Sequence, residues 1–145
     1  MAVSNIEKFD DITGKLFAEL YQSFPLPQML MAGSFVENAM RFDERYGTEV
    51  PTEDAEFFIA TAEWLMQAGY ITCKPYPYMR IDDAVLTAKG LEVLKAIPKS
   101  VASTTSIGEQ LATSAKKGGK EVARGLVSEA FGIGVRILSP MIGLS

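Results

Sequence analysis

TEDAEFFIATAEWLMQAGYITCKPYPYMRIDDAVLTAKGLEVLKAIP, residues 52–98, is the stretch of this sequence that decides the fold. It opens with a helical pattern over 53–68, in which Phe58, Ala62 and Leu65 form one apolar stripe. Thr52 is placed to cap this helix, and three acidic residues follow in the first turn, where the positive end of the helix dipole favours them. A glycine at position 69 is a natural stop.

A hairpin and a second helix are expected after this stop. Residues 70–73 are β-branched and aromatic, as is typical of a strand, and a return strand follows. Pro75 and Pro77 cannot donate to a ladder of hydrogen bonds, so we expect a hairpin tip or a sheet edge. Thr87 is expected to cap a short helix, which Pro98 ends.

The amino-terminal part predicts two further helices. Ile12, Leu16 and Leu20 recur every fourth residue, which is typical of an amphipathic helix, and Pro25 ends it. A second helical pattern begins near residue 28 or 34 and reaches Phe42.

A small, polar stretch separates the carboxy-terminal part from the rest. We expect residues 1–98 to form one domain and 99–106 a linker. From 107 to 145, apolar residues return every three or four positions, which predicts an amphipathic association helix. Two glycines at 118–119 weaken this helix, because each costs about 1 kcal/mol relative to alanine.

The composition argues against an enzyme. The 145 residues contain no histidine and one cysteine, Cys73, so the usual general base, a disulfide framework and a cysteine-based zinc site are absent. Acidic residues occur as adjacent pairs such as Asp82-Asp83, without the spacing of a calcium loop. We therefore expect no catalytic residue, no metal and no cofactor. The first ten residues lack the apolar stretch of a secretory signal, so a cytoplasmic protein is expected.

Two sequence runs carry a resemblance to a known superfamily. Trp64-Leu-Met-Gln-Ala-Gly-Tyr-Ile71 and Val85-Leu-Thr-Ala-Lys-Gly-Leu-Glu-Val-Leu94 resemble runs found on either side of the wing in bacterial winged-helix proteins. The resemblance implies a mainly α fold with a small β-hairpin, a winged-helix-like domain followed by the carboxy-terminal amphipathic helix. Winged helices read DNA or bind proteins. The helix that would enter a DNA groove, 53–68, has four acidic residues and no basic one, so phosphates would repel it.

Two groups of apolar residues are candidates for a protein interface. The group around the hairpin consists of Tyr70, Tyr76, Tyr78 and Met79. The group on the carboxy-terminal helix consists of Leu126, Phe131, Ile133 and Ile137. Each group either covers the chain's own core or faces a partner or second subunit. We therefore expect a non-enzymatic interaction or regulatory protein that binds another protein through the hairpin tyrosines, the carboxy-terminal helix or both.

The alternative function is a DNA-binding transcriptional regulator that dimerises through the carboxy-terminal helix. Its phosphate contacts would come from Lys74, Arg80 and Lys89, the basic residues near the hairpin. A third interpretation attaches the tail to a membrane surface. Two charges and Pro140 within the last twenty-one residues argue against a helix that spans the bilayer.

Overall fold

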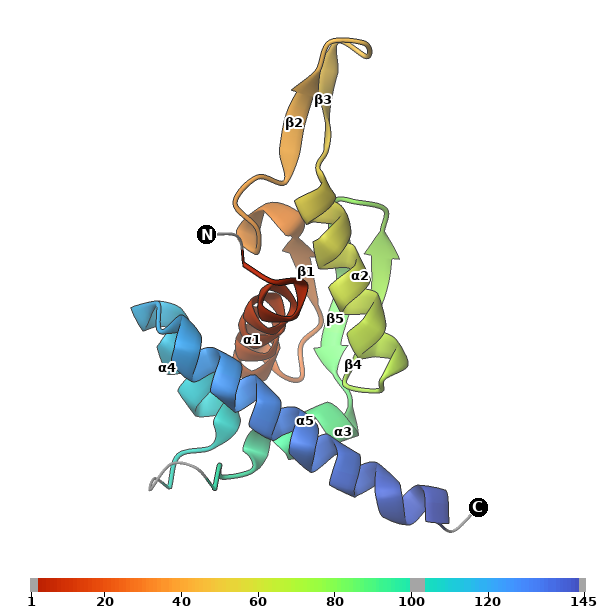
Figure 1. Ribbon diagram of the computed structural model, residues 1–145. Coiled ribbons are helices and arrows are strands. Elements are labelled where there is room, and N and C mark those ends of the chain that lie inside the picture. The colour runs from red at the N-terminus through yellow and green to blue at the C-terminus, as the bar shows by residue number, and fades with distance from the viewer. Residues whose placement is uncertain (1–2, 100–103, 144–145) are drawn as a thin grey trace.

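Helices make up most of the chain, and the strands form two small antiparallel sheets (Figure 1). The computed structural model describes residues 3–99 and 104–143, with side chains as far as Ile137. The expectation of a mainly α fold with a β-hairpin is confirmed. Within the described residues the elements are α1 (Asn5–Ser23), β1 (Gln28–Met31), the 3-10 helix η1 (Ala32–Ser34), β2 (Met40–Asp43), β3 (Thr48–Pro51), α2 (Glu53–Gln67), β4 (Ile71–Tyr76), β5 (Arg80–Leu86), α3 (Ala88–Lys95), α4 (Ile107–Lys117) and α5 (Lys120–Gly143).

Local signals fix the starts of α2 and α3. The side chain of Thr52 accepts a hydrogen bond from the backbone N–H of Ala55, and that of Thr87 accepts one from Gly90. Each such cap stabilises its helix by about 1 kcal/mol. At the far end of α2, Gly69 adopts a φ of +91°, a left-handed conformation that turns the chain toward β4.

The three-stranded sheet has the order β1-β5-β4, and both pairings are antiparallel. β4 is therefore an edge strand, as its proline requires, and Pro77 lies in the turn after it. One face of the sheet packs on α1 and α2 and buries Ile71, Ile81 and Leu86.

The prediction of a helix that begins near residue 28 or 34 is wrong, because this segment forms β1, η1 and β2. Leu30 is buried while Met29 and Met31 are exposed, so the side chains alternate with the period of a strand. Phe35 anchors the segment by stacking on a ring of α2, with centroids 5.0 Å apart. The apolar spacing that suggested a helix therefore comes from a strand followed by one anchoring ring.

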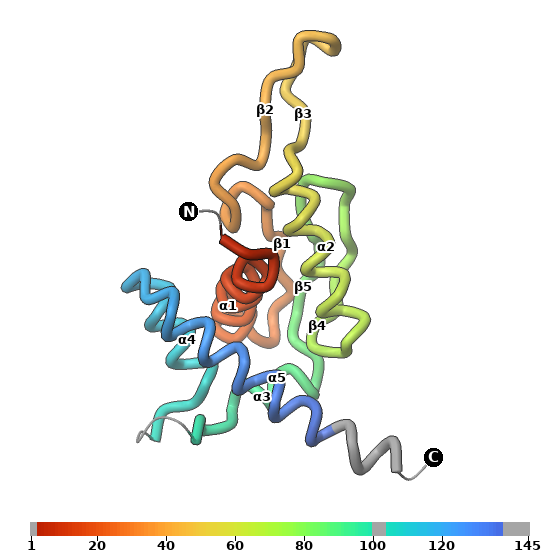
Figure 2. Tube along the Cα trace, viewed as in Figure 1, coloured from red at the N-terminus to blue at the C-terminus, as the bar shows by residue number. Residues whose placement is uncertain are grey.

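Strands β2 and β3 form a separate two-stranded sheet that projects from the body (Figures 1 and 2). The register places Met40 opposite Pro51 and Asp43 opposite Thr48. The turn between the strands is held by the Asp43 carboxylate, which accepts the backbone N–H of Arg45 at 2.8 Å.

The predicted carboxy-terminal helix is two helices. α4 ends at Gly118, whose φ of +74° breaks the helix, and α5 begins two residues later. α1 lies between these two helices on one side and α2 with the sheet on the other (Figure 1). Residues 100–103 of the predicted linker and 144–145 of the predicted association helix lie outside the described residues.

One hydrophobic core joins the parts of the chain before and after the predicted linker. A Cβ at Gly14 of α1 would lie 3.5 Å from Cγ2 of Val127, which shows how closely α1 and α5 approach. The fully buried side chains include Phe17, Phe58, Leu65, Ile81, Leu94, Ile107, Leu111 and Val127.

An ion-pair cluster ties α5 to the start of α1. Arg124 donates two hydrogen bonds to Asp11, Nε to Oδ1 at 2.7 Å and Nη2 to Oδ2 at 2.9 Å. Its Nη1 donates to Glu7 at 2.9 Å. Hydrogen bonding with Asp11 is the main cause that raises the pKa of Arg124 above its usual range.

Candidate protein interface

The three-stranded sheet brings Met31, Arg80 and Tyr76 side by side. Its register places Met31 opposite Arg80 and Arg80 opposite Tyr76. Facing residues of an antiparallel pair lie on the same face, and the next residue along each strand lies on the other. Because the adjacent Leu30 and Ile81 are buried, this row lies on the outer face of the sheet.

The turn after β4 adds Tyr78 and Met79 to the row. The N–H of Met79 donates to the carbonyl of Tyr76 at 3.2 Å, and the carbonyl of Met79 accepts from Ala32 at 2.8 Å. These bonds fix the turn against η1. Tyr76 and Tyr78 are 49% and 48% exposed. The name tyrosine surface is used below for Met31, Tyr76, Tyr78, Met79 and Arg80.

Tyr78 holds a backbone conformation that its side chain disfavours. Its φ is +62°, in the left-handed region, where a residue with a Cβ is less stable by about 1–2 kcal/mol. Turns usually place glycine or asparagine at such a position. The turn therefore does not require a tyrosine at this position.

The charges beside the tyrosine surface are balanced within the chain. The guanidinium carbon of Arg80 lies 4.3 Å from the ring centroid of Tyr76, and its Nε donates to Asp82 at 2.9 Å. Lys74 lies 3.5 Å from a carboxylate oxygen of Asp83. The result is an apolar, aromatic surface with one stacked cation.

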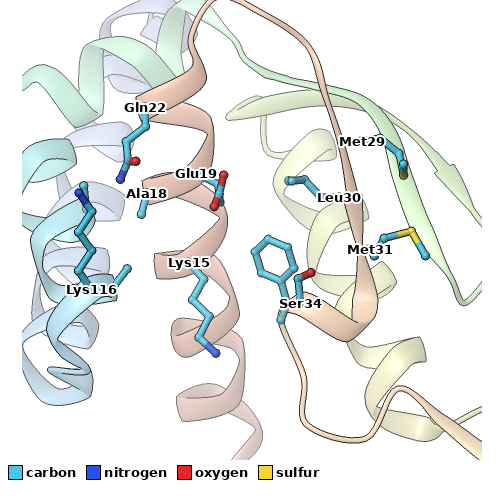
Figure 3. A pocket seen from close by; sticks show the side chains of 12 residues that line it. Lys15, Ala18, Glu19, Gln22, Met29, Leu30, Met31, Ser34 and Lys116 are labelled. Atoms are coloured by element: carbon cyan, nitrogen blue, oxygen red, sulfur yellow. The ribbon is translucent and has the colours of Figure 1, made fainter.

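A groove of about 450 Å³ lies between β1, α1 and α4. In Figure 3, Leu30 points from β1 toward α1, whereas Met29 and Met31 point to the opposite side of the strand. Lys15 and Glu19 lie along α1 at this groove. The groove borders the tyrosine surface at Met31.

Tyr70, which was predicted to be an interface residue, lies in the core instead. Its ring packs against Phe17 and Phe131, with centroids 5.9 Å and 5.3 Å away. A Cβ at Gly134 would lie 2.1 Å from the Tyr70 hydroxyl, so this glycine makes room for the ring. Burial raises the pKa of Tyr70. The turn at Gly69 explains the difference, since it directs Tyr70 inward while Tyr76 lies at the far end of β4.

The predicted interface residues of the tail face the chain's own body. Leu126 is buried, and Phe131, Ile133 and Ile137 are partly buried against the core. The Phe131 ring also lies 5.7 Å from that of Trp64, on α2. This stripe of α5 is therefore covered by the chain to which it belongs.

The basic residues predicted to contact phosphate all have partners in the chain. Lys89 donates to the carbonyl of Ala68 at 2.9 Å and lies 4.3 Å from the ring centroid of Tyr70. Burial lowers the pKa of Lys89. Lys74 and Arg80 have the carboxylate partners described above. The three cations do not form a common patch free for phosphate.

The environment of Cys73 disfavours a reactive thiolate. Burial, with a smaller contribution from Glu63, raises the pKa of Cys73 to about 11. At neutral pH the thiol is protonated and a weak nucleophile. Over residues 3–99 and 104–143, no cluster of three or more His, Cys, Asp or Glu side chains is arranged to hold a metal ion. In the same part of the chain, every helix is too short or too polar to cross a membrane.

Sequence reasoning missed Met31 and the exposed side chains of the β2–β3 hairpin, Phe42 and Tyr46. All three lie in the segment for which a helix was predicted, or just after it. The sequence carries no signal for Met31, because residues 29–31 are all apolar and their alternation of exposed, buried and exposed side chains appears only in the structure. For the hairpin, the signal is the turn that ends in Gly47, whose φ is +64°.

No protein-family model, no curated protein and no solved structure matches the chain. Function is therefore inferred from the tyrosine surface and its surroundings.

Proposed function

We propose that this chain is a non-enzymatic interaction or regulatory protein that binds a partner protein through the tyrosine surface. The observation that carries the proposal is the row of exposed Met31, half-buried Arg80 and exposed Tyr76, which the exposed side chains of Tyr78 and Met79 extend at the turn. Tyrosine, methionine and arginine are enriched in interface cores. A ring held on a strand or a tight turn also loses little conformational entropy on binding.

We infer that the domain is winged-helix-like and that the turn between β4 and β5 is its wing. The elements α1, β1, α2, β4 and β5 follow one another in this order, with β1 beside β5, which supports the inference. Between β1 and α2 the chain adds η1 and the β2–β3 hairpin. The outer face of α2 favours a protein over DNA as partner, because Glu53, Glu56 and Glu63 are exposed on it. Phosphates would be repelled there.

The carboxy-terminal helices support a binding role for the tyrosine surface rather than for the tail. Their apolar stripe, which includes Leu126 and Phe131, covers the core. What α5 leaves exposed is a different face, with Val122 and Val135. In this proposal the tail completes the domain, and the sheet contacts the partner.

A photo-crosslinking amino acid at position 78 tests the proposal in cells that express the full chain. The control places the same group at Ile97, which is exposed but lies at the end of α3, remote from the wing. We expect an adduct of defined mass from position 78 and none from position 97. Equal adducts from both positions, or none from 78, would contradict the proposal.

A variant of Tyr78 separates binding from stability. Tyr78→Gly removes the ring and suits the left-handed φ, so we expect the free energy of unfolding to stay within about 1 kcal/mol of the parent value. Crosslinking from position 76 to the partner should fall at least tenfold. Unchanged crosslinking would exclude Tyr78 from the interface. Duplex DNA binding that weakens steeply with salt and in Lys74→Ala would support the regulator alternative instead.

A further inference from the structure

The hairpin of β2 and β3, called the arm below (residues 40–51), pairs with no further strand in the described part of the chain, and β3 contacts α2. It projects from the body (Figures 1 and 2), and Phe42 and Tyr46 are 63% and 72% exposed. A two-stranded hairpin by itself is only marginally stable in water. An arm of this kind gains stability when a further strand adds to it.

The two edges of the arm differ in what they offer to a further strand. Thr52 donates its N–H to the carbonyl of Ala39 at 3.0 Å, one step beyond the pair of Met40 and Pro51. Hydrogen-bonded and non-hydrogen-bonded pairs alternate along an antiparallel ladder, so the backbone groups of Met40, Phe42 and Pro51 point to the outer edges. At the edge of β3, Glu49 also points its N–H outward, but Pro51 has no N–H to offer. The edge of β2, with two outward N–H groups, is therefore the more complete one.

The sequence of β2 selects one register for pairing with a second copy of itself. Met40 and Phe42 of β2, and Glu44 just after it in the turn, face the open edge, so only registers that pair these positions form hydrogen bonds. Placing Met40 opposite Met40 puts Arg41 and Phe42 opposite Ala39 and Asn38, which lie outside β2, so this register pairs a single residue of each strand. Placing Met40 opposite Phe42 puts Arg41 opposite Arg41, and placing Phe42 opposite Glu44 puts Asp43 opposite Asp43. Like charges directly opposite each other are destabilising. With Phe42 opposite Phe42, by contrast, each Arg41 faces an Asp43.

We propose that β2 pairs antiparallel with β2 of a second copy of this chain, with Phe42 opposite Phe42 and Arg41 opposite Asp43. The contact is isologous, and it makes one four-stranded sheet from two arms. Arg41 is exposed, whereas the Asp43 carboxylate is buried and accepts from Arg41 and from the backbone N–H of Arg45 in its own chain. This register therefore brings no like charges together, and the exposed Phe42 rings supply the new contact. A contact of a few strand residues is smaller than a standard interface, so the dimer is expected to dissociate on dilution.

The first test is the molar mass of the full chain by sedimentation over a range of concentrations. The parent should be monomeric at low concentration and shift toward dimer as the concentration rises, as expected for a small interface. Phe42→Lys places two cations at the two-fold axis and should weaken dimerisation at least tenfold. Tyr46→Lys is the matched control, since it adds the same charge to the exposed turn of the arm outside the paired strand. Its dimerisation should match that of the parent.

The second test determines the register between the two β2 strands from which introduced cysteines form a disulfide. It uses Cys73→Ser variants, so that the introduced cysteine is the only thiol of the chain. In Phe42→Cys the two sulfurs would face each other across Cα atoms about 5.5 Å apart, within disulfide range. In Met40→Cys they would be offset by four residues, about 13 Å along the strand. Mild oxidation should therefore link Phe42→Cys into a dimer and leave Met40→Cys unlinked. Far-UV circular dichroism checks that every variant is folded.

A parent that stays monomeric at all concentrations overturns the proposal, as does a dimer that Phe42→Lys leaves unchanged. Linking through Met40→Cys in preference to Phe42→Cys overturns the register. These outcomes are independent of the tyrosine surface, because none of the changed residues belongs to it. The crosslink from position 78 remains a separate measurement.

Discussion

At the scale of single residues, Tyr70 shows how two glycines hold a ring inside the core. A Cβ at Gly90 would lie 2.1 Å from the carbonyl oxygen of Tyr70, and one at Gly134 would lie 2.1 Å from its hydroxyl. The first glycine lets α3 approach the start of β4, and the second lets α5 cross the ring. Neither position has space for a side chain unless the core shifts.

Alanine at two neighbouring glycines of α5 should have opposite effects. Gly132→Ala meets no atom within 4 Å and raises helix propensity, so we expect a gain of up to about 1 kcal/mol in the free energy of unfolding. Gly134→Ala gains the same propensity but pushes on the buried ring of Tyr70, and overpacking costs about 1–3 kcal/mol. Denaturant unfolding should therefore place Gly134→Ala below Gly132→Ala. Equal stability would mean that the ring moves freely.

Cys73 should react slowly and in a pH-dependent way. Because burial raises its pKa to about 11 from an ordinary value of 9.0, the folded thiol should be alkylated slowly at neutral pH, with a rate that rises about tenfold per pH unit until the pH approaches 11. Protonation of the thiol also contributes stability below pH 9, and this contribution is lost as the pH rises toward 11. Iodoacetamide kinetics in buffer and in denaturant measure both pKa values. A folded-state midpoint near 9 would contradict the burial of the thiol.

At the scale of elements, the sequence predicts correctly those helices and strands that interactions between near neighbours in the chain determine. The helix after Thr52, the edge strand with Pro75 and the helix after Thr87 could all be predicted, since a cap or a missing N–H acts within a few residues. The segment from β1 to β3 could not be predicted, because the spacing of its apolar residues also fits a helix. Its strand and turn structure depends on the packing of Leu30 and Phe35 into the core. The burial of Tyr70 has the same cause, since α5 covers it from more than sixty residues away.

The packing of α5 on α1 should depend on the shape of one side chain as well as its charge. Arg124 binds Asp11 with two parallel hydrogen bonds, which a lysine cannot reproduce. We expect Arg124→Lys to lower the melting temperature by a few degrees and Arg124→Gln to lower it further. Arg136→Gln, on an exposed position of the same helix, is the control. Equal melting temperatures for all variants would show that the cluster does not hold α5.

At the scale of the whole molecule, the two predicted parts share one core. Leu126 and Val127 of α5 are packed with Phe17 of α1 and Leu111 of α4 in the same cluster. The only tryptophan, Trp64, lies on α2 and has its ring 5.7 Å from that of Phe131 on α5. Unfolding of α5 is thus expected to be cooperative with unfolding of the rest.

Truncating one buried leucine of α5 should destabilise the entire chain. Leu126→Ala removes a buried side chain, and such changes cost about 2–5 kcal/mol. Val122→Ala, on the exposed face of the same helix, should change the free energy of unfolding by less than about 0.5 kcal/mol. Trp64 fluorescence and far-UV circular dichroism should give one coincident transition in both variants. Two separate transitions in Leu126→Ala would mean that α5 unfolds independently.

The position of α5 in the chain also has a consequence for synthesis on the ribosome. Leu126 is added after every other buried leucine of the core, and at roughly 5–20 residues per second it follows Leu94 by a few seconds. During this interval the side of α1 at Gly14 is exposed, because α4 and α5, which cover it in the folded chain, have not yet been synthesised. The nascent chain therefore presents an apolar helix face that chaperones recognise. Slow codons between residues 95 and 125 would prolong that exposure, so translation speed in this stretch bears on the yield of folded protein.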